Sequence, residues 1–242
     1  AHLQRITKMM PDETPKRGIL YVVGTPIGNL EDITHRAEEV LKEVSLCACE
    51  DTRQSRKLLN TLGANPRLIS CRSQNEAACV QPITEALQSG RNVAYLTDAG
   101  TPGVSDPGAR LVQEVRDAGH TVTPVPGVSA MTTLVSVAGL LGGSFSFHGF
   151  LSPKAGRRRK RLQELVEREE AFILYESPHR LVKLLADLRE LAPECVVTVG
   201  RELTKLHEEI VQGSPEELLE AFSSRDRIRG EVTLLVSPRK KG

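Results

Sequence analysis

Short apolar runs alternate with segments of helical spacing along the first half of the chain. Five runs predict buried strands, at residues 18–23, 45–49, 67–71, 92–97 and 121–125. Between and after them, apolar residues recur every three or four positions, which predicts helices, among them 34–44, 54–62 and 129–140. Strands that alternate with helices through short loops form a parallel sheet with helices on both faces. We therefore expect an α/β domain over residues 18–142.

The second half of the chain follows a less regular pattern. Apolar runs at 145–150 and 171–176, and within 194–205, 207–213 and 231–238, predict strands, and only some of them are separated by a predicted helix. Successive strands without intervening helices indicate a mixed sheet. Glycine pairs in GLLGGS (139–144) interrupt the helical pattern and suggest a boundary. We expect two tandem α/β domains, 18–142 and 143–242, after a disordered leader at 1–17 that lacks the apolar core of a signal peptide.

Composition narrows the class of protein only slightly. The 32 Lys and Arg against 31 Asp and Glu leave a net charge of +1, which indicates no particular partner. Five cysteines form no CxxC pair and no zinc spacing with the six histidines, so we expect no metal site and a reducing compartment. The longest apolar run, 128–141, is broken by Ser and Thr. We expect a cytoplasmic protein that binds neither membrane nor DNA.

The loop DAGTPGVSDPG (98–108) is the strongest candidate for a ligand site. It follows the fourth predicted strand and precedes a predicted helix. Its three glycines and two prolines shape the backbone, because glycine tolerates positive φ and proline fixes φ. In open α/β sheets, ligands bind at the carboxyl ends of the strands. An ordinary connector remains the alternative for any one such loop.

Two further loops follow strands and carry chemistry. GTPIGNL (24–30) matches neither GxGxxG nor GxxxxGK[ST], and Pro26 lacks the N–H that a phosphate needs, so a ligand with apolar and sulfur character suits it better. EDTR (50–53) places two acids and a guanidinium after the second strand. Asp51 is either a functional carboxylate or simply a helix cap with Arg53 on the surface.

KAGRRRKR (154–161) holds six basic residues within eight. A solvated helix face is one explanation. Cations at a helix N-terminus oppose the helix dipole, however, so helix stability does not explain them, whereas a phosphate backbone would. An aromatic content of only 3% argues against recognition of single strands by stacking and favours folded RNA read by shape and charge.

Six motifs in order carry a family resemblance: GTPIGNL (24–30), EDTR (50–53), DAGTPGVSDPG (98–108), VPGVSA (125–130), YESPHR (175–180) and RELTK (201–205). Together they resemble the tetrapyrrole methylase superfamily and, within it, the ribosomal RNA small subunit methyltransferase I family. The first loop lacks the Pro–Gly–Asp of the porphyrinoid branch, which favours the RNA branch. Two positions depart from the pattern: Gln74 replaces a histidine, and Gly103 replaces a bulky apolar residue.

The resemblance implies a homodimeric two-domain enzyme with S-adenosylmethionine in the cleft between domains. It would methylate the ribose 2′-hydroxyl of a decoding-centre cytidine, with ribosomal RNA or the small ribosomal subunit as partner. The implied cofactor contacts are Pro26, Ile27, Asp98, Ala99, Gly100, Gly103, Ser105, Ser129, Ala130, Tyr175, Glu176, Leu203 and Gly230. The basic run itself, rather than the resemblance, gives the expected RNA contacts, which are Lys154, Arg157, Arg158, Arg159, Lys160 and Arg161.

A ribose hydroxyl needs a group that accepts its proton or stabilises its alkoxide. In related methylases an acid at the end of the second strand serves as base, which corresponds here to Asp51, which we favour, or Glu50. Lys205 could stabilise an alkoxide or contact phosphate. Glu76, Glu176 and His179 are further candidates. A porphyrinoid methylase and a non-enzymatic nucleotide-binding module remain as rival classes.

Overall fold

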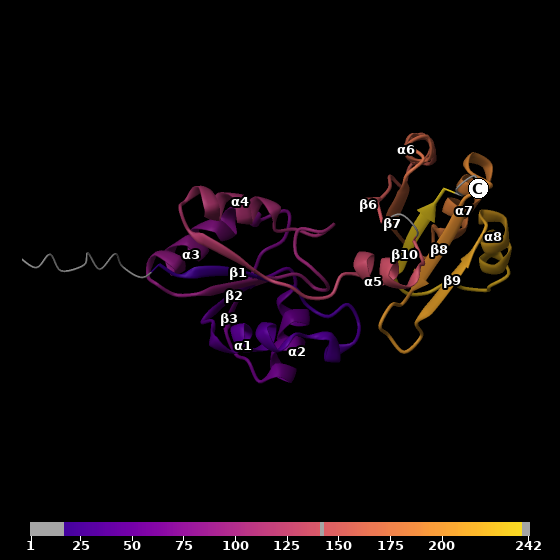
Figure 1. Ribbon diagram of the computed structural model, residues 1–242. Coiled ribbons are helices and arrows are strands. Elements are labelled where there is room, and N and C mark those ends of the chain that lie inside the picture. The colour runs from indigo at the N-terminus through magenta and orange to yellow at the C-terminus, as the bar shows by residue number, and fades with distance from the viewer. Residues whose placement is uncertain (1–16, 141–142, 239–242) are drawn as a thin grey trace, which may run out of the picture.

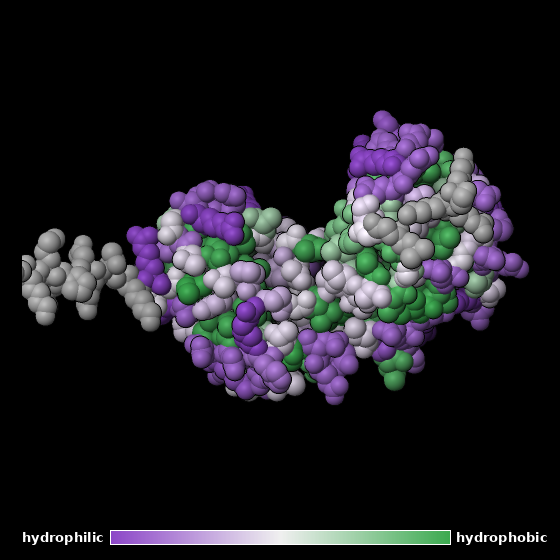
Figure 2. Space-filling view, viewed as in Figure 1, coloured by the Kyte–Doolittle hydropathy of each residue, from purple (hydrophilic) through white to green (hydrophobic). Residues whose placement is uncertain are grey.

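The computed structural model describes residues 17–140 and 143–238 as two lobes joined through one central helix (Figure 1). The expected leader lies outside the described residues except for Arg17, whose guanidinium donates a hydrogen bond to the Gly119 carbonyl at 3.2 Å. The surface is hollowed between the lobes, and hydrophilic residues cover the top of the second lobe (Figure 2). The division into two lobes determines where a ligand can bind.

The first lobe is a parallel sheet covered on both faces. Its elements are β1 (Ile19–Val23), the short 3-10 helix η1 (Leu30–Asp32), α1 (His35–Glu43), β2 (Leu46–Cys49), α2 (Thr52–Leu62), β3 (Arg67–Ser70), α3 (Glu76–Gln88), β4 (Val93–Leu96), α4 (Ala109–Asp117) and β5 (Thr121–Val125). The strand order is β3-β2-β4-β1-β5, and every neighbouring pair is parallel. Core residues of α3 and α4 pack on one face, and those of α1 and α2 pack on the other. The parallel α/β fold expected from the sequence is confirmed.

Local sequence signals explain where the helices begin and end. The Thr34 side chain accepts the Ala37 N–H and starts α1. Gly63, at φ 69°, ends α2 in the left-handed conformation that glycine adopts without strain. The start of α2 differs from expectation: it begins at Thr52 rather than Gln54, because the Asp51 side chain accepts the Arg53 N–H. Asp51 is therefore the N-cap of α2.

The second lobe is a mixed sheet, as expected. Its elements are β6 (Phe145–Phe150), α6 (Ala155–Val166), β7 (Ala171–Glu176), α7 (Leu181–Leu191), β8 (Val196–Arg201), β9 (Glu209–Gly213), α8 (Pro215–Ser223) and β10 (Val232–Ser237). In the order β6-β7-β10-β8-β9, β6 and β7 are parallel and the other pairs are antiparallel. Leucines of α6, α7 and α8 cover one face. The opposite face is turned toward the first lobe.

The helix α5 (Ala130–Val137) connects the two sheets. The expected division at residue 142 assigns this helix to the first domain, yet its core residues pack on the second sheet. Leu134 and Ala138 lie in one buried cluster with Ile173 of β7 and Leu235 of β10. Ile27, from the first loop, belongs to the same cluster. The two lobes therefore share a small apolar core next to the carboxyl ends of β1, β4 and β5.

Candidate active site

Three loops of the first lobe converge at the carboxyl ends of β4, β1 and β5, which are neighbours in its sheet. The loops after β1 and β4 are joined by an isolated antiparallel bridge: the Thr25 N–H donates to the Gly100 carbonyl at 2.9 Å, and the Gly100 N–H donates to the Thr25 carbonyl at 3.1 Å. A Cβ on Gly24 would lie 2.7 Å from the Gly127 nitrogen, so the loops after β1 and β5 approach backbone to backbone. Glycine is required for this contact because any side chain would separate the loops.

The turn between β8 and β9, in the second lobe, packs against the loop that follows β1 in the first lobe. The Asn29 N–H donates to Thr204 Oγ1 at 3.2 Å, and the Lys205 side chain lies where a Cβ on Gly28 would be. Lys205 Nζ pairs with Glu202 and Glu231, each at 3.0 Å. Burial lowers the pKa of Lys205, but these two carboxylates outweigh it and raise the pKa overall. Lys205 is thus a cation held in place by two carboxylates at the contact between the two lobes.

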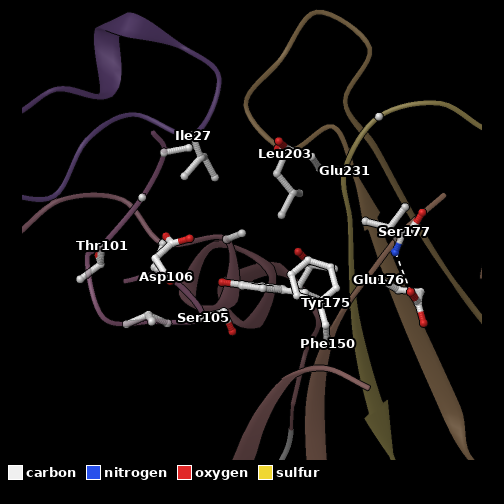
Figure 3. A pocket seen from close by; sticks show the side chains of 18 of the residues that line it. Ile27, Thr101, Ser105, Asp106, Phe150, Tyr175, Glu176, Ser177, Leu203 and Glu231 are labelled. Carbon is white, nitrogen blue, oxygen red and sulfur yellow. Dashed lines mark hydrogen bonds between the residues drawn. The ribbon is translucent and has the colours of Figure 1, made fainter. Parts of the chain in front are cut away.

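A pocket of about 330 Å³ lies between the lobes (Figure 3). Its volume is within the range of small-molecule sites. The first lobe contributes Ile27, Ala99, Gly100, Thr101, Val104, Ser105, Asp106, Ser129 and Ala130; the second contributes Phe150, Tyr175, Glu176, Ser177, Pro178, Leu203, Gly230, Glu231, Val232 and Thr233. In Figure 3, Asp106 lies on the wall formed by the first lobe, across from Tyr175, and above them Ile27 of the first lobe faces Leu203 of the second. The lining combines apolar surface with several hydroxyls and few charges.

Ten of the thirteen residues implied as cofactor contacts line this pocket. They are Ile27, Ala99, Gly100, Ser105, Ser129, Ala130, Tyr175, Glu176, Leu203 and Gly230. The lining does not include Pro26, Asp98 or Gly103. Asp98 Oδ1 instead accepts the Asp51 N–H at 3.0 Å, which ties the end of β4 to the end of β2. Cofactor binding by all thirteen remains a prediction.

Two carboxylates of the pocket lining, Asp106 and Glu231, are not among the residues singled out from the sequence, and Asp106 has the more unusual surroundings. Burial, followed by the nearby Glu50 carboxylate, raises the pKa of Asp106 to about 6, with smaller increases from Asp98 and Glu231 and a decrease from the Thr97 hydroxyl. A carboxyl group with this pKa is largely ionised at neutral pH and is a better proton acceptor than an ordinary aspartate. The signal was present in the sequence, since Asp106 belongs to the predicted ligand loop.

The three first-lobe acids considered as proton acceptors, Glu50, Asp51 and Glu76, lie outside the pocket lining. The hydrogen bond from the Arg53 N–H, 2.8 Å long, lowers the pKa of Asp51. Burial and the Asp98 carboxylate raise the pKa of Glu50. Glu76 is buried, and its Oε1 accepts the Gly108 N–H at 2.7 Å at the start of α4. Asp51 and Glu76 each accept a backbone hydrogen bond at a helix start, and a catalytic role for either one stays a prediction.

Strand alternation places the side chains of the second wall. Along β7, Tyr175 faces the pocket and Glu176 faces the opposite side of the sheet. There the Glu176 carboxylate pairs with Arg180 at 2.6 Å and accepts the Ser177 N–H at 2.7 Å, turned away from the pocket centre (Figure 3). Glu176 can therefore contact a ligand only through its backbone. His179 is exposed near the start of α7 and does not line the pocket.

The basic run divides into paired and unpaired side chains. Arg158 is buried and pairs with Asp187 at 2.7 Å, while Arg159 pairs with Asp187 at 2.9 Å and Glu190 at 2.6 Å. Arg161 pairs with Glu164 at 2.8 Å. Within residues 17–140 and 143–238, the exposed Lys154, Arg157 and Lys160 take part in none of the ion pairs. Arg157 and Lys160 are three residues apart on α6, so they share one face of the helix, and Lys154 is its N-cap residue. We call the three the basic strip.

The described part of the chain contains no cluster of three or more His, Cys, Asp or Glu residues suited to a metal ion. Among the described helices, none has both the length and the apolar character needed to cross a membrane. The pocket between the lobes is therefore the site on which a functional argument can be built.

Comparison with known proteins identifies the class. The family model of tetrapyrrole (corrin/porphyrin) methylases matches residues 19–219, and the chain belongs to this family. A uroporphyrin-III C-methyltransferase from Thermus thermophilus has the same fold, with a TM-score of 0.63 at 23% identity over 91% of this chain and 94% of that one. A cobalt precorrin-4 methyltransferase superposes with a TM-score of 0.66 at 17% identity, over 90% of this chain and 94% of that one.

Sequence similarity places the chain more narrowly. It is 46% identical over 220 residues to the ribosomal RNA small subunit methyltransferase I of Borrelia garinii, covering 90% of this chain and 98% of that protein. The protein of the same name from Coprothermobacter proteolyticus is 44% identical, over 93% and 100% of the two chains. Within the tetrapyrrole methylases, the chain belongs to the ribosomal RNA small subunit methyltransferase I family.

Proposed function

We propose that this protein is an S-adenosylmethionine-dependent methyltransferase of small-subunit ribosomal RNA. The target would be the ribose 2′-hydroxyl of a decoding-centre cytidine, as the family resemblance implies. The observation that carries the proposal is the pocket formed by the 98–108 loop and PGVSA in a chain 46% identical to a protein named for ribosomal RNA methylation. We further propose that the enzyme acts as a cytoplasmic homodimer.

The chemistry of the pocket fits S-adenosylmethionine. Ile27, Leu203 and Tyr175 offer apolar surface, while Ser129 and Thr233 offer hydroxyls, and Asp106 adds a negative charge. A ligand that joins an apolar chain, a nucleoside and positive charge matches this combination. When bound, S-adenosylmethionine supplies an electrophilic methyl group on a sulfonium. The backbone of the 98–108 loop would hold its methionine part, and Tyr175, Glu176, Leu203 and Gly230 of the second wall would hold its adenosine.

Asp106 is the best-placed proton acceptor for the substrate hydroxyl. Its carboxylate lines the pocket, and its pKa of about 6 keeps it ionised at neutral pH. General-base catalysis requires the acceptor within hydrogen-bond reach of the proton, which favours a group in the pocket over one on its rim. Asp51 and Glu50, at the end of β2, stay as the acceptors that the resemblance implies. Lys205 would hold Glu231 and the turn between β8 and β9 in place rather than take a proton.

The basic strip would bind the phosphates of the RNA. Lys154, Arg157 and Lys160 are exposed, and the other three basic residues of the run are engaged in ion pairs. Figure 2 shows hydrophilic surface over α6 on the second lobe, beside the hollow between lobes. A long-range attraction from this surface would bring the anionic substrate to the cleft.

One experiment tests the function. The protein is incubated with labelled S-adenosylmethionine and either assembled small subunits lacking the modification, the corresponding free RNA, or uroporphyrinogen. We expect label in the ribose of one cytidine, located by mass spectrometry of nuclease fragments. Label in uroporphyrinogen alone would assign the porphyrinoid reaction instead. Absence of cofactor binding in calorimetry would indicate a protein that is not a methyltransferase.

A further inference from the structure

Three aromatic side chains gather at one wall of the pocket. The chain has only eight phenylalanine and tyrosine residues and no tryptophan. Phe147 and Tyr175 meet edge to face with ring centroids 4.9 Å apart, and Phe150 meets Tyr175 at 5.7 Å with an interplanar angle of 64°. The low aromatic content, which argued against stacking, conceals this concentration at the site.

Phe150 is the outermost ring of the three. Its exposed fraction is 58%, although it lines the pocket, whereas Phe147 and Tyr175 are partly buried. Leaving so much of a phenyl ring in water forgoes the free energy that its burial would contribute. An exposed ring beside a pocket is typical of a surface that a ligand covers.

A backbone irregularity turns Phe150 toward the pocket. Regular alternation in β6 would place Phe147 on the pocket face and Phe150 on the opposite face. The register against β7 shifts between Phe147 and Phe150, and Gly149 adopts φ 58°. A Cβ on Gly149 would lie only 2.4 Å from Ser105 Oγ of the first lobe. Glycine therefore serves both the bulge and the contact between lobes, and bulges commonly re-aim side chains beside active sites.

The position of Phe150 links the pocket to the basic strip. Phe150 ends β6, and Lys154 follows four residues later at the start of α6. Four residues span at most about 14 Å, so the ring lies within a few nucleotide lengths of the strip. RNA whose phosphates contact the strip can therefore present a neighbouring nucleotide to the ring.

We infer that Phe150 is the platform on which the target nucleobase stacks while its ribose enters the pocket. The inference rests on the proposed function. A ribose hydroxyl can reach a pocket between two lobes only if its nucleotide leaves the RNA stack, which costs stacking energy. An aromatic ring at the pocket mouth restores part of that energy, because every base offers a flat face to it. The ligand is thus a single extruded nucleotide, and Phe150 is a positioning residue.

The test uses three substitutions and one matched control. Phe150→Leu keeps apolar bulk without a ring, Phe150→Ala removes both, and Phe150→Tyr keeps the ring. Leu206→Ala changes another exposed apolar residue, 92% exposed and outside the pocket lining. We measure kcat and KM for methylation of unmodified small subunits, S-adenosylmethionine affinity by calorimetry, and RNA affinity against salt concentration.

We expect Phe150→Leu and Phe150→Ala to lower kcat/KM for the subunit by roughly 5–150-fold, as loss of one stacked base predicts. Phe150→Tyr and Leu206→Ala should resemble wild type. Cofactor affinity and the salt slope should not change, because the inference assigns Phe150 to the nucleobase and not to the cofactor or the phosphates.

Two results would overturn the inference and leave the proposed function standing. Wild-type kinetics in Phe150→Leu would show that no base stacks on the ring. A loss of S-adenosylmethionine affinity in the same variant, matching its loss of kcat/KM, would assign the ring to the adenine of the cofactor. Wild-type protein that methylates neither subunits nor RNA would instead overturn the proposed function, and the inference with it.

Discussion

The two lobes treat charge in opposite ways. In the second lobe, buried or half-buried charges are paired: Arg158 and Arg159 enclose Asp187, and Glu209 lies between Arg201 and Arg225. At the pocket wall of the first lobe, the strongest influences on Asp106 are burial and other carboxylates, and its pKa rises to about 6. By contrast, the pKa of Glu209 falls to about 2. Hydrogen bonds and charge from Arg225 and then Arg201 lower it by more than burial raises it.

This difference separates structural from functional charge. A paired buried charge stabilises the fold because its partner replaces the lost hydration. A carboxylate surrounded by other carboxylates destabilises the folded protein, and such groups are concentrated at functional sites. The comparison predicts that removing charge from each lobe has opposite effects on stability.

The largest effect on stability is expected from the paired charges of the second lobe. Arg158→Ala would leave the buried Asp187 with only Arg159 and should lower the free energy of unfolding by about 3 kcal/mol, the lower end for broken buried pairs. Arg157→Ala, one residue away and exposed, should change it by less than about 0.5 kcal/mol. Urea unfolding measures both. Equal midpoints for the two variants would show that burial of the pair does not matter.

At the first-lobe wall of the pocket, Asp106→Asn should lower the methylation rate at saturating cofactor about 10²-fold, because asparagine cannot accept the proton, and the loss of cofactor affinity should be smaller. In wild type, the rate should rise with pH through about 6 as Asp106 ionises, if it is the proton acceptor. Asp51→Asn is the matched control, because asparagine caps a helix as well as aspartate does. A loss confined to Asp51→Asn would return the role to the acid that the family resemblance implies.

Asp106→Asn should also stabilise the protein at pH 7, by about 1–2 kcal/mol after allowance for partial solvent exposure. The pKa of Asp106 is 3.8 unfolded and about 6 folded, so its contribution is present below pH 3.8 and lost as pH rises through 6. Melting temperatures of wild type and variant should therefore converge at low pH and separate above pH 6. A variant less stable at pH 7 would contradict the unpaired charge.

The smallest effect on the protein itself is expected at the basic strip. Replacing Lys154, Arg157 and Lys160 by alanine should leave stability nearly unchanged, because within the described structure these side chains join no ion pair. RNA affinity should fall, and its salt slope should flatten by about 0.7–0.9 for each phosphate that the variant no longer neutralises. Parallel plots of RNA affinity against salt for wild type and triple variant would show that the basic strip is only a solvated face and contacts no phosphate.

Much of the fold could be predicted from the sequence alone. The alternation of apolar runs and helical spacing predicted five parallel strands in the first lobe and a mixed sheet in the second, and the structure confirms both. The loop at 98–108 was predicted as a ligand loop from its glycines and prolines, and most of it lines the pocket. These features depend on neighbours in the chain, through hydrogen bonds within helices and the burial of one face of an element.

Other features depend on residues distant in sequence, and only the tertiary structure decided them. The EDTR motif allowed Asp51 to be a helix cap or a base; the fold shows it as the N-cap of α2 and places Asp106 in the pocket, and a role of Asp51 as a base stays a prediction. One basic run contained both a buried arginine and an exposed strip, because Asp187 approaches only one face of α6. Phe150 reached the pocket through a bulge whose glycine meets Ser105 of the other lobe. Spacing along the chain determines on which side of a helix or strand a side chain lies. The residues that it contacts there are determined by how the elements of the two lobes pack.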